Sequence, residues 1–128
     1  MHPTVVAVLA IVLALQIKHL IADFYLQNGY IIQNRRLYGH PAGLLHVAIH
    51  LAGSLVVLVL FHTPLWLLGA MLLCEGLFHY HLDWAKDNYV ANRGLTPRDA
   101  AFWHAFGIDQ ALHHASYLAM AWAWAVWA

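Results

Sequence analysis

The chain has 128 residues, of which 62% are hydrophobic and 9% are Asp, Glu, Lys or Arg. Soluble domains carry about 25% of these charged residues, so the composition excludes a soluble globular domain and a disordered tail. The six basic and six acidic residues cancel, which excludes the basic surface that nucleic-acid binding requires. The sequence therefore predicts an integral membrane protein whose partner is the lipid bilayer, with no nucleic acid bound.

Four apolar stretches are each close to the roughly 20 residues that a helix needs to cross a membrane. They run over residues 4–27, 41–61, 64–84 and 108–127. The connection His62-Thr63-Pro64 is very short and predicts that the second and third stretches form an antiparallel hairpin. The segment Thr96-Pro97-Arg98-Asp99 is typical of a helix start and predicts a short interfacial helix over residues 97–106. We expect an all-α fold in which a single domain, residues 1–128, forms a four-helix membrane bundle.

Basic side chains in the connections predict the orientation of the bundle. They lie between the first and second stretches and between the third and fourth, at Arg35, Arg36, Lys86, Arg93 and Arg98. Because cytoplasmic loops of membrane proteins are enriched in Lys and Arg, both connections are expected to face the cytoplasm and both termini the outer side. This pattern predicts a multi-pass protein of the bacterial inner membrane.

With this orientation, the intramembrane polar residues fall in the cytoplasmic halves of the helices. At about 1.5 Å per residue, eight of them lie roughly 5–16 Å below the cytoplasmic edge: His19, Asp23, His46, His50, His79, Asp83, Asp109 and His113. On each helix they share one narrow face with further polar residues, which are Gln16, Gln27, Ser54, Glu75, Lys86 and Tyr117. In hydrocarbon such faces must point at one another, so the sequence predicts a polar pocket inside the bundle.

Two other charged positions have a different environment. Lys18 points away from the polar face of its helix, which leaves two interpretations: the side chain snorkels or pairs with another subunit, or it has a function. Glu75 is the deepest of the polar residues and is expected to be neutral unless a charged partner lies beside it. Neither residue is assigned to the metal site.

The spacing of the eight residues suits metal binding. Three helices carry a His and an Asp four residues apart, and the fourth carries His46 and His50 at the same spacing, so that each pair shares one helix face. Imidazole and carboxylate without thiolate suit zinc, manganese or iron. The set is sufficient for one divalent metal ion with a supporting shell or for two ions. A structural hydrogen-bond network and ligation of a haem are the alternatives.

Three functional hypotheses follow from this layer. A bound ion lowers the pKa of its water toward about 7, so the first is a metal-dependent hydrolase of a lipid-linked or amphipathic substrate. In it Asp83 or Asp23 acts as base, and Lys86 either orients an anionic group or merely neutralises Asp83. The second is a non-enzymatic accessory subunit of a respiratory or photosynthetic complex, with the layer structural or binding haem, pigment or quinone. The third is an ion or proton pathway. Because the bundle is small, we also expect a homo-oligomer or a larger membrane complex.

The order and spacing of four motifs also resemble a known family. The motifs are His19-x-x-x-Asp23-Phe24-x-x-Gln27, a helix with His46, His79-x-x-x-Asp83-x-x-Lys86, and Asp109-Gln110-x-x-His113. Over nearly the whole chain they resemble the bacterial integral-membrane family called domain of unknown function 3307. The resemblance implies a membrane protein and emphasises the same residues without an activity, and His50, Glu75 and His114 have no place in its pattern. A looser similarity exists to small bacterial membrane proteins described as metal-dependent hydrolases.

Overall fold

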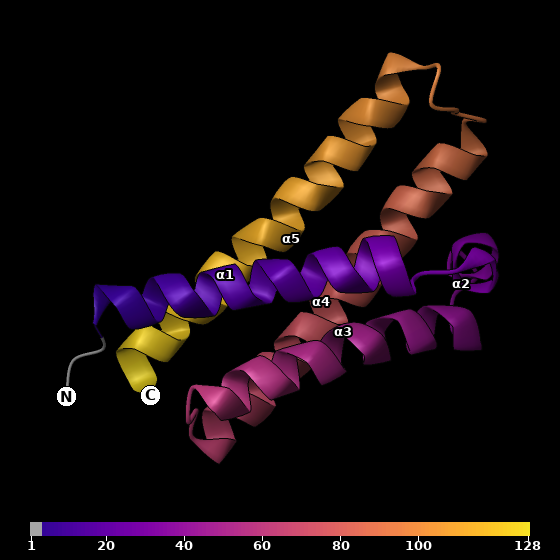
Figure 1. Ribbon diagram of the computed structural model, residues 1–128. Coiled ribbons are helices and arrows are strands. Elements are labelled where there is room, and N and C mark those ends of the chain that lie inside the picture. The colour runs from indigo at the N-terminus through magenta and orange to yellow at the C-terminus, as the bar shows by residue number, and fades with distance from the viewer. Residues whose placement is uncertain (1–3) are drawn as a thin grey trace.

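The computed structural model describes residues 4–128, and within that range it contains helices and no strand. The helices are α1 (Val5–Ile21), the five-residue π-helix η1 (Ala22–Leu26), α2 (Gly29–Asn34), α3 (Pro41–Leu60), α4 (Leu65–Asn92) and α5 (Ala100–Trp127) (Figure 1). Side chains fix several of their starts. The Thr4 hydroxyl accepts a hydrogen bond from the Ala7 N–H at 3.2 Å, and the Asn28 amide oxygen accepts one from the Ile31 N–H at 3.0 Å. Both are N-caps that satisfy free N–H groups at a helix start. The prediction of an all-α fold is confirmed.

Among residues 4–128, three helices are long and apolar enough to cross a membrane. They are α1 together with η1 (Val5–Leu26), α3 and α4. The fourth expected span lies within α5, which is long enough with 28 residues but not apolar enough to meet the same measure. It carries His104, Asp109, His113 and His114, and these polar side chains lower its mean hydropathy.

The long helices contact one another in the cyclic order α1, α3, α4, α5 and back to α1. The start of α1 and the end of α5 lie close together in Figure 1. This end of the molecule has an apolar core, made of Ile11, Leu15, Val57, Leu58, Leu67, Met71, Tyr117, Met120 and Ala121. The buried histidines and aspartates gather in the other half of the helices.

The region before the last span differs from the expectation. The interfacial helix expected over residues 97–106 and the span expected over 108–127 form one continuous helix, α5, which starts at Ala100. Pro97 lies in a turn ahead of it, where the Thr96 N–H and hydroxyl donate to Asp99 Oδ2 at 2.7 and 2.9 Å. These two hydrogen bonds lower the pKa of the exposed Asp99 carboxyl. The capping motif thus closes the turn, and no proline interrupts the helix after it.

The segment around residue 25 also contains structure that was not expected. The first span was predicted as one helix over residues 4–27, but regular α-helix ends at Ile21 and the chain continues as the π-helix η1. Single π turns are frequent at functional sites, and this one contains Asp23. The short helix α2 then follows in a segment predicted as a plain connection. Together they place Asp23 and Arg35 beside the polar half of the bundle.

Candidate metal centre

Five histidine rings from the four long helices meet at the centre of the molecule. They are His19 of α1, His46 and His50 of α3, His79 of α4 and His113 of α5, all 2% exposed or less. The ring centroids of His50 and His79 lie 3.9 Å apart, and those of His79 and His113 lie 4.2 Å apart. The structure thus brings together imidazoles that are as far as 94 positions apart in the chain, from His19 to His113.

The carboxylates of Asp23 and Asp83 lie between these rings. Asp23 Oδ1 is 2.9 Å from His50 Nε2 and 3.3 Å from His46 Nε2, and Asp23 Oδ2 is 3.1 Å from His19 Nε2. Asp83 Oδ2 is 3.1 Å from His46 Nε2 and 3.3 Å from His79 Nε2. The other oxygen, Asp83 Oδ1, is 3.6 Å from His113 Nε2. Each carboxylate is therefore shared by three imidazoles.

Asp109 lies at the edge of this cluster. Its backbone carbonyl accepts a hydrogen bond from His113 Nδ1 at 2.8 Å, while its carboxylate Oδ2 is 3.8 Å from the same nitrogen. Since a carbonyl can only accept, His113 Nδ1 must carry the proton, and the neutral ring then has its lone pair on Nε2. That lone pair points to the side of the ring where Asp83 lies. Of the eight residues expected at the site, seven are buried and Asp23 is half-buried.

Several buried ring nitrogens have no hydrogen-bond partner among residues 4–128. They include both nitrogens of His79, Nε2 of His113 and Nδ1 of His46. A buried polar atom without a partner costs about 1–3 kcal/mol, and such atoms are rare in native proteins. The donor set is therefore incomplete without a further group, and imidazole nitrogens beside carboxylates are ligands for a divalent metal ion.

Arg35 is a site residue that the sequence pattern did not identify. It follows α2, and its guanidinium lies 3.4 Å from Asp83 Oδ2 and 3.3 Å from His46 Nε2, and donates to Gln27 Oε1 at 2.6 Å. It also pairs with Asp87. Burial alone would lower the pKa of Arg35, but the Asp83 and Asp87 carboxylates raise it above its usual value. In the sequence, Arg35 stood out only as one of the basic residues of the connections, and these residues indicated the orientation in the membrane rather than a role in the site.

Lys18 is buried, so the interpretation that it snorkels or pairs with another subunit is wrong. Its Nζ pairs with Glu75 Oε1 at 2.6 Å and donates to Tyr117 Oη at 3.1 Å, and it is 3.5 Å from His50 Nδ1.

Gln16, expected on the polar face, is exposed instead. The buried stripe of α1 passes through Leu15 and Lys18 and continues to Ala22 in η1, because it continues the face that packs the apolar core.

This network supports the histidines from the apolar side. Tyr117 Oη lies 2.9 Å from His19 Nδ1, and the Ser54 hydroxyl donates to Glu75 Oε1 at 2.9 Å. Groups that bind the second nitrogen of a ligating imidazole fix its ring and raise its basicity. The residues Lys18, Ser54, Glu75 and Tyr117 form what we call the supporting network.

Gly53 of α3 provides the space for the Lys18 stem. A Cβ at this position would overlap Lys18 Cγ and lie 2.9 Å from its Cδ. Because the Glu75 ion pair holds the ammonium group of Lys18, its aliphatic stem cannot move out of the space beside Gly53.

Gly53→Ala is expected to lower the free energy of unfolding by about 1–3 kcal/mol, as measured by denaturant titration in detergent. Gly69→Ala is the control, since nothing lies within 4 Å of that position and alanine favours a helix by about 1 kcal/mol. Equal effects of the two substitutions would contradict this account.

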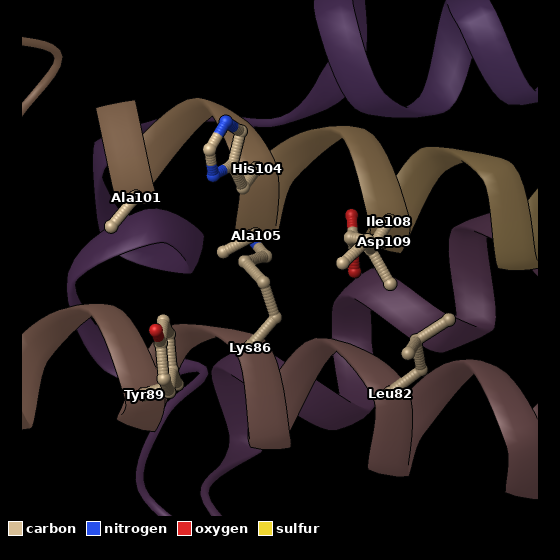
Figure 2. Close-up of a pocket in the computed structure, with 8 residues that line it drawn as sticks. All are labelled: Leu82, Lys86, Tyr89, Ala101, His104, Ala105, Ile108 and Asp109. Atoms are coloured by element: carbon tan, nitrogen blue, oxygen red, sulfur yellow. The ribbon is translucent and has the colours of Figure 1, made fainter. Parts of the chain in front are cut away.

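Lys86 lies at a pocket between α4 and α5. It pairs with Asp87 Oδ1 at 2.6 Å, and in the described part of the chain no ion pair joins it to Asp83, whose cationic partner is Arg35. The interpretation that Lys86 neutralises Asp83 is therefore wrong. The pocket has a volume of about 410 Å³ and is lined by Leu82, Lys86, Tyr89, Ala101, His104, Ala105, Ile108 and Asp109. Figure 2 shows Lys86 extending toward α5, with Asp109 nearer the centre of the molecule.

One protein family has a model that matches residues 11–128, and its description is "Protein of unknown function (DUF3307)". This agrees with the family that the motifs resemble. No curated protein and no solved structure matches the chain. The looser similarity to membrane hydrolases thus gains no support from these comparisons.

Proposed function

The chain belongs to the DUF3307 family of proteins of unknown function, and we propose from the geometry of its site that it is a membrane protein with a divalent metal centre in its cytoplasmic half. The single observation that carries the proposal is a pair of buried ring nitrogens, His79 Nε2 and His113 Nε2, that lie 3.3 and 3.6 Å from the Asp83 carboxylate and have no hydrogen-bond partner among residues 4–128. The eight residues proposed to hold metal are His19, Asp23, His46, His50, His79, Asp83, Asp109 and His113.

The distances support this use of the cluster. An ion about 2.0–2.1 Å from each ligand atom, with tetrahedral angles, separates two ligand atoms by about 3.3 Å. The separations of Asp83 from the Nε2 atoms of His46, His79 and His113 are 3.1, 3.3 and 3.6 Å. A purely structural network would be expected to satisfy its own nitrogens, and this one leaves both nitrogens of His79 free.

Larger ligands have less support. The cavity beside His46, Asp83 and Arg35 has a volume of about 10 Å³, which is about the space that one water molecule needs. Haem, a pigment or a quinone is too large for this cavity. Zinc, manganese or iron fits the donor types.

We further propose that the helices α1, α3, α4 and α5 form a four-helix membrane bundle with both termini outside. The basic residues of the connections, Arg35, Arg36, Lys86, Arg93 and Arg98, then lie on the cytoplasmic side, as the distribution of Lys and Arg in membrane proteins requires. The polar half of the bundle faces the same side. The protein would reside in the bacterial inner membrane, as a homo-oligomer or within a larger complex.

The proposed reaction is hydrolysis of a lipid-linked or amphipathic substrate. A bound divalent ion supplies a water whose pKa is lowered to about 7. Asp23 would act as the base through Oδ2, the oxygen that does not face His46 and His50; it lies 3.1 Å from His19 Nε2 and accepts a hydrogen bond from Gln110 at 3.4 Å. The pocket between α4 and α5 supports access from the cytoplasmic side, because its inner wall, Asp109, adjoins His113. Lys86 in that pocket can attract an anionic group.

Elemental analysis of protein purified in detergent without added metal tests the proposal. Wild type is expected to contain zinc, manganese or iron, and His79→Ala is expected to lose it. His81→Ala is the matched control, because His81 lies on the same helix but is exposed and is hydrogen-bonded to Tyr38. Folded wild-type protein without any metal would refute the metal centre, and a haem absorption band would favour an accessory subunit of a larger complex.

A further inference from the structure

The candidate ligand atoms divide into two groups. Each residue of a group offers one ring nitrogen or carboxylate oxygen, and the atoms offered within one group all lie within 4.8 Å of one another. The first group, which we call the first position, is Asp23, His46, His50 and His79, and the second position is His79, Asp83 and His113. A tetrahedral ion takes four ligands, so the cluster offers more donors than one ion can use.

The first position has four candidate ligands, the number that a tetrahedral ion takes. Asp23 Oδ1 is 2.9 Å from His50 Nε2 and 3.3 Å from His46 Nε2, close to the separation of about 3.3 Å between ligands of one tetrahedral ion. Asp23 is held for this role by the π turn η1 and by the hydrogen bond from Gln110. Four protein ligands would close this site, as in structural zinc centres.

The second position has three protein ligands and one free coordination site. Nε2 of His79 and Nε2 of His113 lie 3.3 and 3.6 Å from the Asp83 carboxylate, and neither nitrogen has a hydrogen-bond partner. Catalytic metal sites keep such an open position for water or substrate. His113 also hydrogen-bonds the backbone of Asp109, which lines the pocket between α4 and α5, so this position is nearer to the substrate pocket.

Two residues connect the positions. His79 belongs to both groups, and neither of its ring nitrogens has a hydrogen-bond partner among residues 4–128. A neutral imidazole has one lone pair, so His79 would serve both ions only as an imidazolate, after its N–H proton is released to solvent. Asp83 reaches from the second position to the first, because its Oδ2 lies 3.1 Å from His46 Nε2. Shared ligands of this kind are typical of paired metal ions in helical bundles.

We propose that the centre holds two divalent ions of different roles: a closed, structural ion at the first position and an open, reactive ion at the second. This inference rests on the proposed function. Imidazole with carboxylate suits zinc at both positions, and two imidazoles with one carboxylate also suit iron(II) at the second.

The test is a titration of metal-depleted protein with zinc alone, followed by elemental analysis after removal of unbound ion. Wild type is expected to retain two ions per chain, and His50→Ala and His113→Ala one each. His81→Ala, an exposed histidine on α4, should retain two. If His50→Ala does not fold, His46→Gln removes another ligand of the first position and should also retain one ion.

Cobalt(II) absorption then distinguishes the two roles without an activity assay. The ion left in His113→Ala is expected to give the strong visible bands of a four-coordinate site that do not change with added azide. The ion left in His50→Ala is expected to respond to azide, because its fourth position is open. One ion per chain in wild type would overturn this inference and leave the proposed function standing, whereas no ion would overturn both. An azide response at the first position alone would overturn the assignment of roles.

Discussion

Replacing Asp83 with asparagine is expected to remove the ion that we propose His79 and His113 to hold, and to abolish the proposed hydrolysis. The amide has no negative charge to bind a cation, and the carboxylate of Asp83 is the group that His46, His79 and His113 share at 3.1–3.6 Å. Loss of a supporting group alone weakens metal binding by about 10–100-fold, so loss of a direct ligand should weaken it at least about 100-fold. Zinc affinity by calorimetry and hydrolysis of p-nitrophenyl fatty-acid esters in mixed micelles measure the two effects.

Asp87→Asn is the matched control for this substitution. Asp87 lies one turn further along α4, and its carboxylate pairs with Arg35 and Lys86. The variant removes a charge of the same sign from the same helix, yet it should keep zinc affinity within a few-fold of wild type. If Asp87→Asn and Asp83→Asn weakened zinc binding equally, the effect would be one of general charge and the assignment of Asp83 would be wrong.

Lys18→Met is expected to destabilise the fold by about 3–5 kcal/mol, because it leaves the buried Glu75 carboxylate without its cation. Lys18 and Glu75 are 7% and 3% exposed, and their atoms lie 2.6 Å apart in the apolar half of the bundle. Methionine preserves the length of the stem over Gly53, so that the lost charge is the main change. Unfolding by denaturant in detergent, monitored by circular dichroism, measures the loss of free energy.

The double variant Lys18→Met with Glu75→Gln separates the ion pair from the packing. Removing both charges leaves no unpaired ion, and the double variant should recover most of the stability that Lys18→Met loses. A double variant as unstable as the sum of the two single ones would show that the charges act independently, against the contact in the structure.

Helical periodicity explains how much of the site could be predicted from the sequence. The i, i+4 spacing of His19 with Asp23, and of His79 with Asp83, fixes which side chains share a helix face whatever the helix packs against. Apolar surroundings then force these faces inward. For the same reason the supporting role of Tyr117, one turn beyond His113, follows from its spacing.

The rest depended on packing that periodicity does not encode. Lys18 is buried because Glu75 and the gap at Gly53 receive it, and these residues belong to other helices. Arg35 reaches Asp83 only because α2 folds back beside the bundle. The apolar and polar pattern likewise gave no sign of the π turn at Asp23 or of the continuity of α5.

The helices α4 and α5 have 28 residues each, which makes them about 42 Å long, against a hydrocarbon thickness of about 30 Å. Such a mismatch is relieved by tilting or by projection into the water. In Figure 1 their far ends lead away from α1 and α3, which favours projection as an arm. In the proposed orientation this arm would lie on the cytoplasmic side. Because the pocket with Lys86 and His104 lies along this arm, from Asp109 out to Ala101, an amphipathic molecule could enter it at the membrane surface without leaving its own leaflet.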